Sequence, residues 1–292
     1  MPYQYVLLAI LISAAWGGNF VAARIVLDVF PPYMLLTFRF LGMLLILIPF
    51  YPKPTIPLKH IAALSALLGS VHFTLMFSAL YFGLDVQHMV ISTQLGVPFS
   101  CLLGAIFFKD KIGLTRTTGI VISFVGICII CISPRLLSQL WQFGMACGAA
   151  FAWAVANIYM KRLGKINILS VLAWVSVFAV PQLALCSYIF EDGQIDAFYQ
   201  AGTRIWSAMA YIVIACTIFA FGGWYWLLSR FTVSQVVPYS LLIPVFGFLA
   251  VQIFFNEPIT IYYIIGGITV IFGVAIITFR RPKNYHNVTT IN

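Results

Sequence analysis

Long apolar stretches alternate with short polar breaks along almost the whole chain. The breaks carry turn-forming residues, as in Pro31-Pro32, Gly83-Leu84-Asp85 and Ser133-Pro134. Ten of the stretches have about the 20-residue length with which a helix crosses a bilayer. The pattern therefore predicts an all-α integral membrane protein with ten transmembrane helices, at Tyr5–Val26, Tyr33–Phe50, Ile61–Phe82, Val86–Phe108, Ile112–Ile132, Phe143–Met160, Ile168–Phe190, Trp206–Leu228, Val233–Phe255 and Ile259–Phe279.

The second half of the chain repeats features of the first. Trp153 and Asn157 echo Trp16 and Asn19. Further pairs recur 146 or 147 residues apart: Pro98 and Pro244, Gly119 and Gly266, Gly126 and Gly273. We therefore expect two five-helix units, residues 1–136 and 137–292. Because five is odd, the second unit enters the membrane from the opposite side, as in the inverted repeats of alternating-access transporters.

The basic residues predict the orientation. With the N-terminus inside, three arginines fall on the outer side, Arg24, Arg135 and Arg204. Twelve basic residues fall on the cytoplasmic side: Lys53, Lys59, Lys109, Lys111, Arg116, Lys161, Arg162, Lys165, Arg230, Arg280, Arg281 and Lys283. The positive-inside rule then places both termini in the cytoplasm. The last of the 16 basic residues, Arg39, lies within the second segment.

Composition narrows the function classes. The chain is 62% hydrophobic and 8% charged, and its basic residues are scattered between apolar runs. This distribution argues against a nucleic-acid partner. The four histidines show no zinc-protease spacing and no GxSxG nucleophile motif is present, so we expect no catalytic residues, no metal and no cofactor. A membrane receptor remains an alternative.

Several stretches resemble the EamA family of the drug/metabolite transporter superfamily, and most closely its bacterial O-acetylserine/cysteine exporter branch. They are "WGGNFVAAR", "PPYMLLTFRF", "QLGVPFSCLLGAIFF", "AWAVANIYMK" and the run from "GGWYWLLSRF" to "FFNE". The resemblance implies a central cavity lined mainly by the first, third, fourth, sixth, eighth and ninth helices, with the fifth and tenth at the periphery. One position departs from the exporter branch, because His72 stands where that branch has glutamine.

Polar groups at membrane depth indicate a binding site. An amide without partners is costly in lipid, so Asn19 and Asn157 must face inward, either bonding a neighbouring helix or contacting substrate. We list the candidate substrate-binding residues as Asn19, His72, Gln94, Asn157, Trp224, Tyr239 and Ser240. Candidate cavity walls are Trp16, Trp153 and Tyr225.

Two prolines and one arginine complete the candidate site. Pro98 and Pro244 are possible hinges, since each frees the carbonyl four residues earlier, that of Gln94 or Ser240. Arg39 lies in the second helix, outside the lining that the resemblance implies; it could bind a substrate carboxylate or serve packing.

These features predict a carrier of small zwitterions, amino acids or their derivatives, in the bacterial inner membrane. All seven acidic residues fall at segment ends or in loops, which favours a facilitator, exchanger or exporter without a buried carboxylate relay. Carriers of sugar phosphates, nucleotide sugars or drugs are the alternative within the superfamily. They would need several cationic groups, and Arg39 is the one expected at depth. The carrier could be a monomer or a homodimer.

Overall fold

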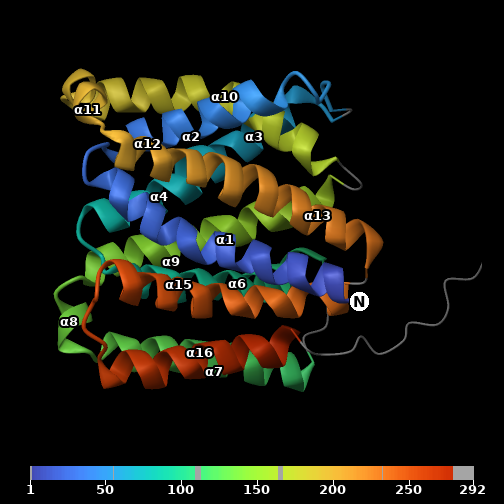
Figure 1. Cartoon of the computed structure of the whole chain (residues 1–292). Coiled ribbons are helices and arrows are strands. Elements are labelled where there is room, and N and C mark those ends of the chain that lie inside the picture. Colours follow the sequence, from blue (N-terminus) through green and yellow to red (C-terminus); the bar gives the residue numbers. More distant parts are fainter. Residues whose placement is uncertain (1, 55, 109–112, 164–166, 232, 279–292) are drawn as a thin grey trace, which may run out of the picture.

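The protein is a bundle of helices that lie side by side (Figure 1). The computed structural model describes residues 2–54, 56–108, 113–163, 167–231 and 233–278. Within these residues there is no strand, and the predicted all-helical class is confirmed. Eight helices or continuous helical runs are long and apolar enough to cross a membrane: α1 (Tyr3–Leu27), α3 through α4 (Leu58–Tyr81), α5 through α6 (Val86–Phe108), α7 (Leu114–Cys131), α9 (Leu140–Arg162), α10 (Ile168–Phe190), α12 through α13 (Thr203–Arg230) and α16 (Ile261–Thr278).

Two further apolar helices are shorter. α2 (Pro32–Leu47) has 16 residues, so it is about 24 Å long, less than the roughly 30 Å hydrocarbon core of a bilayer. The sequence predicted a helix to Phe50, but the chain turns after Leu47. α15 (Leu242–Phe254) is the other short helix and directly follows a 3₁₀ segment. Three small elements lie in the connections: α8 (Pro134–Leu137), α11 (Gln194–Gln200) and α14 (Val233–Val236).

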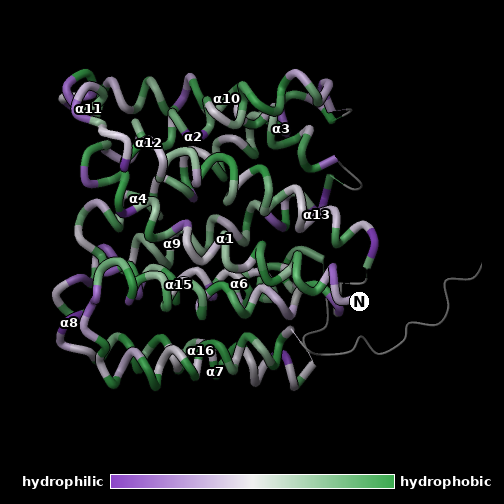
Figure 2. Tube along the Cα trace, viewed as in Figure 1, coloured by the Kyte–Doolittle hydropathy of each residue, from purple (hydrophilic) through white to green (hydrophobic). Residues whose placement is uncertain are grey.

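Successive helices run in alternating directions, so the connections between them lie at two opposite ends of the bundle. Hydrophilic residues gather at these two ends (Figures 1 and 2). We call the end where α1 begins the near end, and the end that carries α8 and α11 the far end. Every acidic residue that the structure describes lies at the far end: Asp28, Asp85, Glu191, Asp192, Asp196 and Glu257. The described near end carries Lys53, Lys59, Arg116, Lys161, Arg162 and Arg230. The other six basic residues predicted on that side lie outside the described residues, as does Asp110.

Four segments depart from α-helical geometry, and they form two matched pairs. The π segments are η1 (Ala66–Phe73) and η3 (Tyr211–Phe219), and the 3₁₀ segments are η2 (Thr93–Leu95) and η4 (Val237–Leu241). Each 3₁₀ segment lies just before one of the two prolines singled out in the sequence, Pro98 in α6 (Gly96–Phe108) and Pro244 in α15. Proline has no N–H to donate four residues back, so the i→i−4 ladder is interrupted there.

Glycines bring α7 and α16 into close contact at one edge of the bundle. A Cβ added to Gly119 would lie 2.7 Å from the carbonyl oxygen of Gly273, and one added to Gly126 would lie 2.7 Å from that of Gly266. Gly119 and Gly266 are equivalent in the sequence repeat, as are Gly126 and Gly273. The contacts are therefore reciprocal, which is the pattern that two related units make across a twofold axis.

Candidate functional site

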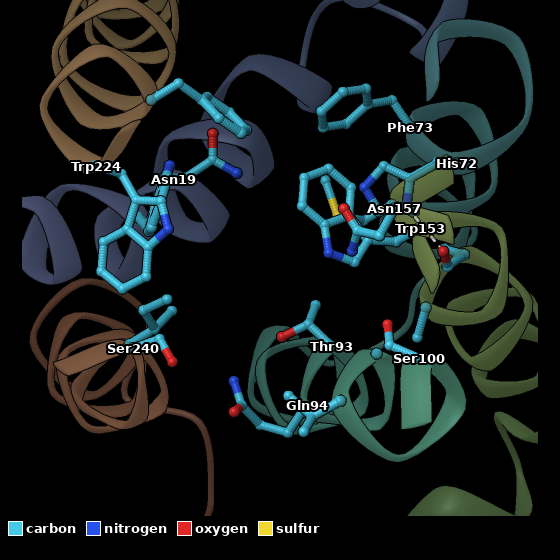
Figure 3. A pocket seen from close by; sticks show the side chains of 18 of the residues that line it. Asn19, His72, Phe73, Thr93, Gln94, Ser100, Trp153, Asn157, Trp224 and Ser240 are labelled. Atoms are coloured by element: carbon cyan, nitrogen blue, oxygen red, sulfur yellow. Dashed lines mark hydrogen bonds between the residues drawn. The ribbon is translucent and has the colours of Figure 1, made fainter. Parts of the chain in front are cut away.

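A cavity of about 660 Å³ lies in the middle of the bundle (Figure 3). This volume suits a small metabolite. Residues from both halves of the sequence line it, and all six helices that the resemblance implied contribute. Ten of the predicted site residues are among them: Trp16, Asn19, Arg39, His72, Gln94, Trp153, Asn157, Trp224, Tyr225 and Ser240.

Three of the predicted residues lie outside the cavity lining. Pro98 and Pro244 are buried in their helices, beside the 3₁₀ segments. The backbone carbonyl of Tyr239 accepts a hydrogen bond from Ser13 Oγ at 2.8 Å, and its side chain packs against the apolar cluster between α1 and α13 (Ala220–Arg230). Tyr239 thus joins two helices at the edge of the cavity.

Aromatic rings form much of the cavity wall. Trp16 donates its indole N–H to the carbonyl of Cys216 at 3.0 Å, so its position is fixed by the η3 segment. Its ring meets those of Phe221 and Trp224 edge-on, with ring centroids 5.3 Å apart in both cases. Phe221 also faces Trp153, with centroids 6.2 Å apart. The two tryptophans of the sequence repeat are therefore joined through one phenylalanine.

The polar groups of the cavity come from several helices. Asn19 and Asn157 lie on different sides of the cavity, and Gln94, Thr93 and Ser240 lie below them in the view of Figure 3. Asn19 is 7% exposed and its Oδ1 atom has no hydrogen-bond partner among the described residues. An interhelical bond through that oxygen is therefore not made in this conformation. Gln94 lies in η2, beside the break in the helical ladder.

His72 joins the third and sixth helical runs. Its Nδ1 lies 2.8 Å from the carbonyl oxygen of Ala149 in α9, and because a carbonyl only accepts, Nδ1 carries the hydrogen. The imidazole lies beside the rings of Phe73 and Trp153, which are tilted to it, with ring centroids 4.6 and 5.1 Å away. This geometry fits a neutral imidazole that holds two helices together at the cavity wall.

Arg39 lies against the cavity, although sequence reasoning placed the second helix outside the lining. Its side chain is 3% exposed, and its Cζ atom lies 4.1 Å from the centroid of the Phe73 ring. Arg39 also lines a second, smaller cavity of about 30 Å³, which Thr217 and Tyr225 border as well. The resemblance misplaced Arg39 because it named whole helices, and α2 reaches the cavity through this one long side chain.

Two further cations at the mouth of the cavity were missed by the sequence analysis. Arg116 at the start of α7 and Lys161 at the end of α9 both line it. Lys161 Nζ lies 4.2 Å from the centroid of the Phe108 ring. Sequence reasoning had counted both as loop charges, since their helix ends gave no sign of facing inward. The lining therefore holds three cations, and none of its residues is acidic.

The cavity reaches the near end of the bundle, and the far end is closed. Arg116 and Lys161 are near-end residues, so the lining extends to that surface. Toward the far end the helices pack on fully buried side chains, including Phe30, Leu80 and Leu84. The structure therefore describes a cavity that is accessible from one end.

Charged residues fasten the closed end, and we call Asp85, His88, Arg135 and Glu257 the far-end cluster. Asp85 forms a two-point ion pair with Arg135, whose Nη2 lies 2.9 Å from Asp85 Oδ1. His88 Nδ1 lies 3.5 Å from Asp85 Oδ2. Burial alone would raise the pKa of Asp85, but hydrogen bonding and charge from Arg135 and His88 outweigh burial, and the pKa lies well below its usual range.

Glu257 completes the far-end cluster by capping α5 (Val86–Ser92) from another part of the chain. Its carboxylate accepts the backbone N–H groups of Val86 at 2.9 Å and Gln87 at 3.1 Å. Glu191 does the same for α2, where Tyr33 and Met34 donate. A carboxylate at a helix N-terminus satisfies free N–H groups and complements the helix dipole.

The described residues contain no group of three or more His, Cys, Asp or Glu side chains that could hold a metal ion. The described lining offers amide and hydroxyl groups for hydrogen bonds, aromatic surfaces and fixed positive charge.

The chain is similar to a known family of transporters over almost its whole length. The family model described as EamA-like transporter family matches residues 4–132 and 140–279. A protein named "Probable amino-acid metabolite efflux pump" from Salmonella typhimurium is 26% identical over 281 residues, covering 93% of this chain and 94% of that protein. Its counterpart of the same name in Escherichia coli is 28% identical over 281 residues, with the same coverage.

Two further matches also cover nearly the whole chain. "Uncharacterized transporter YoaV" from Bacillus subtilis is 26% identical over 284 residues, covering 93% of this chain and 96% of that protein. Among the solved structures that match, one titled "Crystal structure of protein" has a TM-score of 0.66 at 16% identity, covering 94% of this chain and 96% of that chain. At that identity the match shows the fold alone.

Proposed function

The chain belongs to the EamA-like transporter family, and from that premise we propose that it carries amino acids or closely related small zwitterions across the bacterial inner membrane by alternating access. Two relatives that match over nearly their whole length carry names that refer to amino-acid metabolites. The cavity volume of about 660 Å³ and its mixed polar and aromatic lining suit molecules of this size and chemistry.

One observation carries the proposal: a cavity lined by both halves of the chain reaches the near end and is closed at the far end. A carrier needs a site that can be reached from one side at a time. In the proposed cycle this structure is one of the two access states, and the other opens by separating the helices that the far-end cluster now joins. The interrupted ladders at Pro98 and Pro244 are the proposed hinges of that motion.

We further propose ten membrane spans in two inverted units, residues 1–136 and 137–292. The reciprocal contacts of Gly119 with Gly273 and of Gly126 with Gly266 support this arrangement, as do the matched π and 3₁₀ segments. The two short apolar helices, α2 and α15, then take their place as spans within a bundle whose neighbours cover them.

The near end is the proposed cytoplasmic side, with both termini there. The described near end carries six basic residues and the far end carries three arginines, and the positive-inside rule places the end with more lysine and arginine in the cytoplasm. Reporter fusions after Arg162 and after Asp192 test it. A cytoplasmic signal at the first site and an external signal at the second agree with the orientation, and the reverse pair of signals overturns it.

Within the cavity, Asn19, His72, Gln94, Asn157, Trp224 and Ser240 are the proposed substrate-contacting residues, with Trp16, Trp153 and Tyr225 as wall. Aromatic rings exclude water from the substrate while their edges leave polar groups accessible. With the described acids at the far end, no carboxylate relay crosses the cavity region. The proposed transport is therefore facilitated diffusion, exchange or export along an existing gradient.

A phosphorylated cargo is the second candidate, and the two mouth cations favour it. Amino acids remain the first candidate, because two relatives that match over nearly their whole length carry names that refer to amino-acid metabolites.

Efflux from whole cells tests the proposed cargo. Bacteria that lack endogenous amino-acid exporters are fed dipeptides, so that the hydrolysed amino acids accumulate inside. Expression of the protein should lower the internal level and raise the external level of at least one amino acid. Equal levels with and without expression, for every dipeptide supplied and with the protein present in the membrane, overturn the proposal.

A further inference from the structure

Three buried polar atoms in the lining of the central cavity make no hydrogen bond with any described residue: Arg39 Nη1, Asn19 Oδ1 and Arg116 Nε. Arg116 lies at the mouth. Arg39 Nη1 is a donor and Asn19 Oδ1 is an acceptor, so their chemistry is complementary. We propose that together they bind the head group of an α-amino acid, with the carboxylate on Arg39 and the ammonium on Asn19. This assignment rests on the proposed transport function and names the substrate chemistry of the same cavity.

The Arg39 charge requires an anion. A guanidinium at membrane depth is costly unless it is paired or reaches water, and its side chain is 3% exposed. The ion pairs among the described residues do not include Arg39. The Arg39 Cζ atom lies 4.1 Å from the centroid of the Phe73 ring, and this cation–π contact leaves the Nη1 donor without a hydrogen-bond partner.

The Asn19 oxygen supplies the second half of the head-group site. Asn19 lies one turn after Trp16 on α1, and Trp16 packs edge-on against Phe221 at 5.3 Å. Asn19, Arg39 and Phe221 all line the central cavity. An amide oxygen accepts readily from an ammonium group.

The absence of acids in the lining explains why an amide must serve as acceptor. A carboxylate beside Arg39 would neutralise the anion site, whereas a neutral acceptor holds the ammonium and leaves the guanidinium for the substrate. The remaining wall is largely aromatic, with Trp153, Phe221 and Trp224. The substrate side chain therefore meets an apolar surface, and the favoured cargo has an apolar body.

A planar carboxylate fits this site better than a phosphate. A guanidinium binds a carboxylate through two parallel N–H bonds. A phosphate dianion needs more than one cation for its charge, and the other two cations of the lining, Arg116 and Lys161, lie at the mouth. Their place suits them to attract anions into the cavity before the head group reaches Arg39.

The test compares four probes in binding to the full-length protein, measured by quenching of the cavity tryptophans. The probes are leucine, leucinamide without the carboxylate, isocaproate without the amino group, and glycerol phosphate. The wild type should bind leucine roughly 10- to 100-fold more tightly than either analogue, since hydrogen bonds to charged groups discriminate by about that much. Glycerol phosphate should bind no better than leucinamide.

The wild type should prefer leucine over leucinamide and also over isocaproate, and each variant should lose one of these two preferences and keep the other. In Arg39→Gln the leucine-to-leucinamide ratio should fall to near one, while leucine is still preferred over isocaproate. In Asn19→Ala the second ratio should collapse and the first should remain. Arg24→Gln is the matched control, because Arg24 pairs with Asp28 on the far-end surface at 3.7 Å and should leave both ratios unchanged.

The ratio of two dissociation constants measured on one variant does not depend on how much of that protein is folded. Should Arg39→Gln be poorly stable, Arg39→Lys supplies a charged replacement, which should keep a reduced preference for leucine over leucinamide. An unchanged leucine-to-leucinamide ratio in Arg39→Gln overturns the inference while the transport proposal stands. Tightest binding of glycerol phosphate overturns the amino-acid head group and leaves a carrier of another cargo. No binding of any carboxylate by the wild type overturns both.

Discussion

Glu257 and Val86 are joined by a hydrogen bond of 2.9 Å, although 171 residues separate them in the chain. The carboxylate between the last two apolar segments thereby caps the first turn of α5, whose continuation carries Gln94 into the cavity. A single acid at the closed end is thus connected through one helical run to the candidate site.

Replacing Glu257 by Ala should destabilise the protein by roughly 1–3 kcal/mol, because two backbone donors of α5 lose a charged acceptor. Glu257→Gln should cost less, since the amide oxygen can still accept. Thermal unfolding in detergent measures both changes. Asp192→Asn is the control, because Asp192 is an exposed far-end acid. A loss in Asp192→Asn equal to that in Glu257→Ala would show that the cap has no special value.

The ion pair of Asp85 and Arg135 should hold the far end closed over the whole physiological pH range. The pKa of Asp85 is lowered in the folded protein, so its stabilising contribution is complete above its unfolded pKa of about 3.9. It is lost only as the pH falls through the lower folded value. Amide hydrogen exchange of α5, corrected for the intrinsic pH dependence of exchange, should therefore give constant protection between about pH 5 and pH 8.

Asp85→Asn breaks the same ion pair at neutral pH. Protection of the α5 amides should fall in this variant while protection in α10 is unchanged. Protection that drops steeply between about pH 8 and pH 5 in the wild type would contradict the predicted sign.

Gly119→Ala should disrupt the contact of α7 with α16, because the new Cβ meets the Gly273 carbonyl, backbone that cannot move aside cheaply. We expect a loss of roughly 1–3 kcal/mol. Gly273→Ala should cost a similar amount, since the contact is reciprocal. Gly144→Ala in α9 is the matched control, as nothing lies within 4 Å of a Cβ at that position. If thermal unfolding shows the same loss of stability for Gly144→Ala as for the other two variants, the close packing of α7 on α16 is refuted.

Gln94→Ala and Asn157→Ala should each weaken binding of the transported amino acid without unfolding the protein. A lost hydrogen bond costs about 1 kcal/mol, or about 1.5–3 kcal/mol when the partner is charged, so the dissociation constant should rise roughly fivefold to a hundredfold. Titration calorimetry in detergent gives that constant, and circular dichroism checks the helical content. Unchanged affinity together with a lowered melting temperature would assign both residues to helix packing.

Local sequence patterns predicted most of the helices, because the length of an apolar stretch and the turn residues that bound it are properties of neighbouring positions. The same patterns predicted that Asn19, Trp16 and their counterparts in the repeat face the cavity, since an amide at membrane depth has to face inward. The far-end cluster escaped prediction because Glu257 and Arg135 meet their partners only after folding. Arg39 was misplaced, and Arg116 and Lys161 were overlooked, because the reach of a long side chain depends on helix rotation and tilt. Both are set by packing.

The most direct measurement of the central claim is counterflow of labelled amino acids into liposomes that contain the purified protein. Liposomes preloaded with unlabelled leucine should accumulate labelled leucine transiently, with or without a pH gradient, because the described cavity lining has no acidic group to carry protons. His72→Gln should retain this activity, as the amide can still donate to the Ala149 carbonyl that His72 bonds at 2.8 Å. Counterflow equal to that of empty liposomes for every amino acid tested, or uptake that requires a pH gradient and disappears in His72→Gln, would contradict the account.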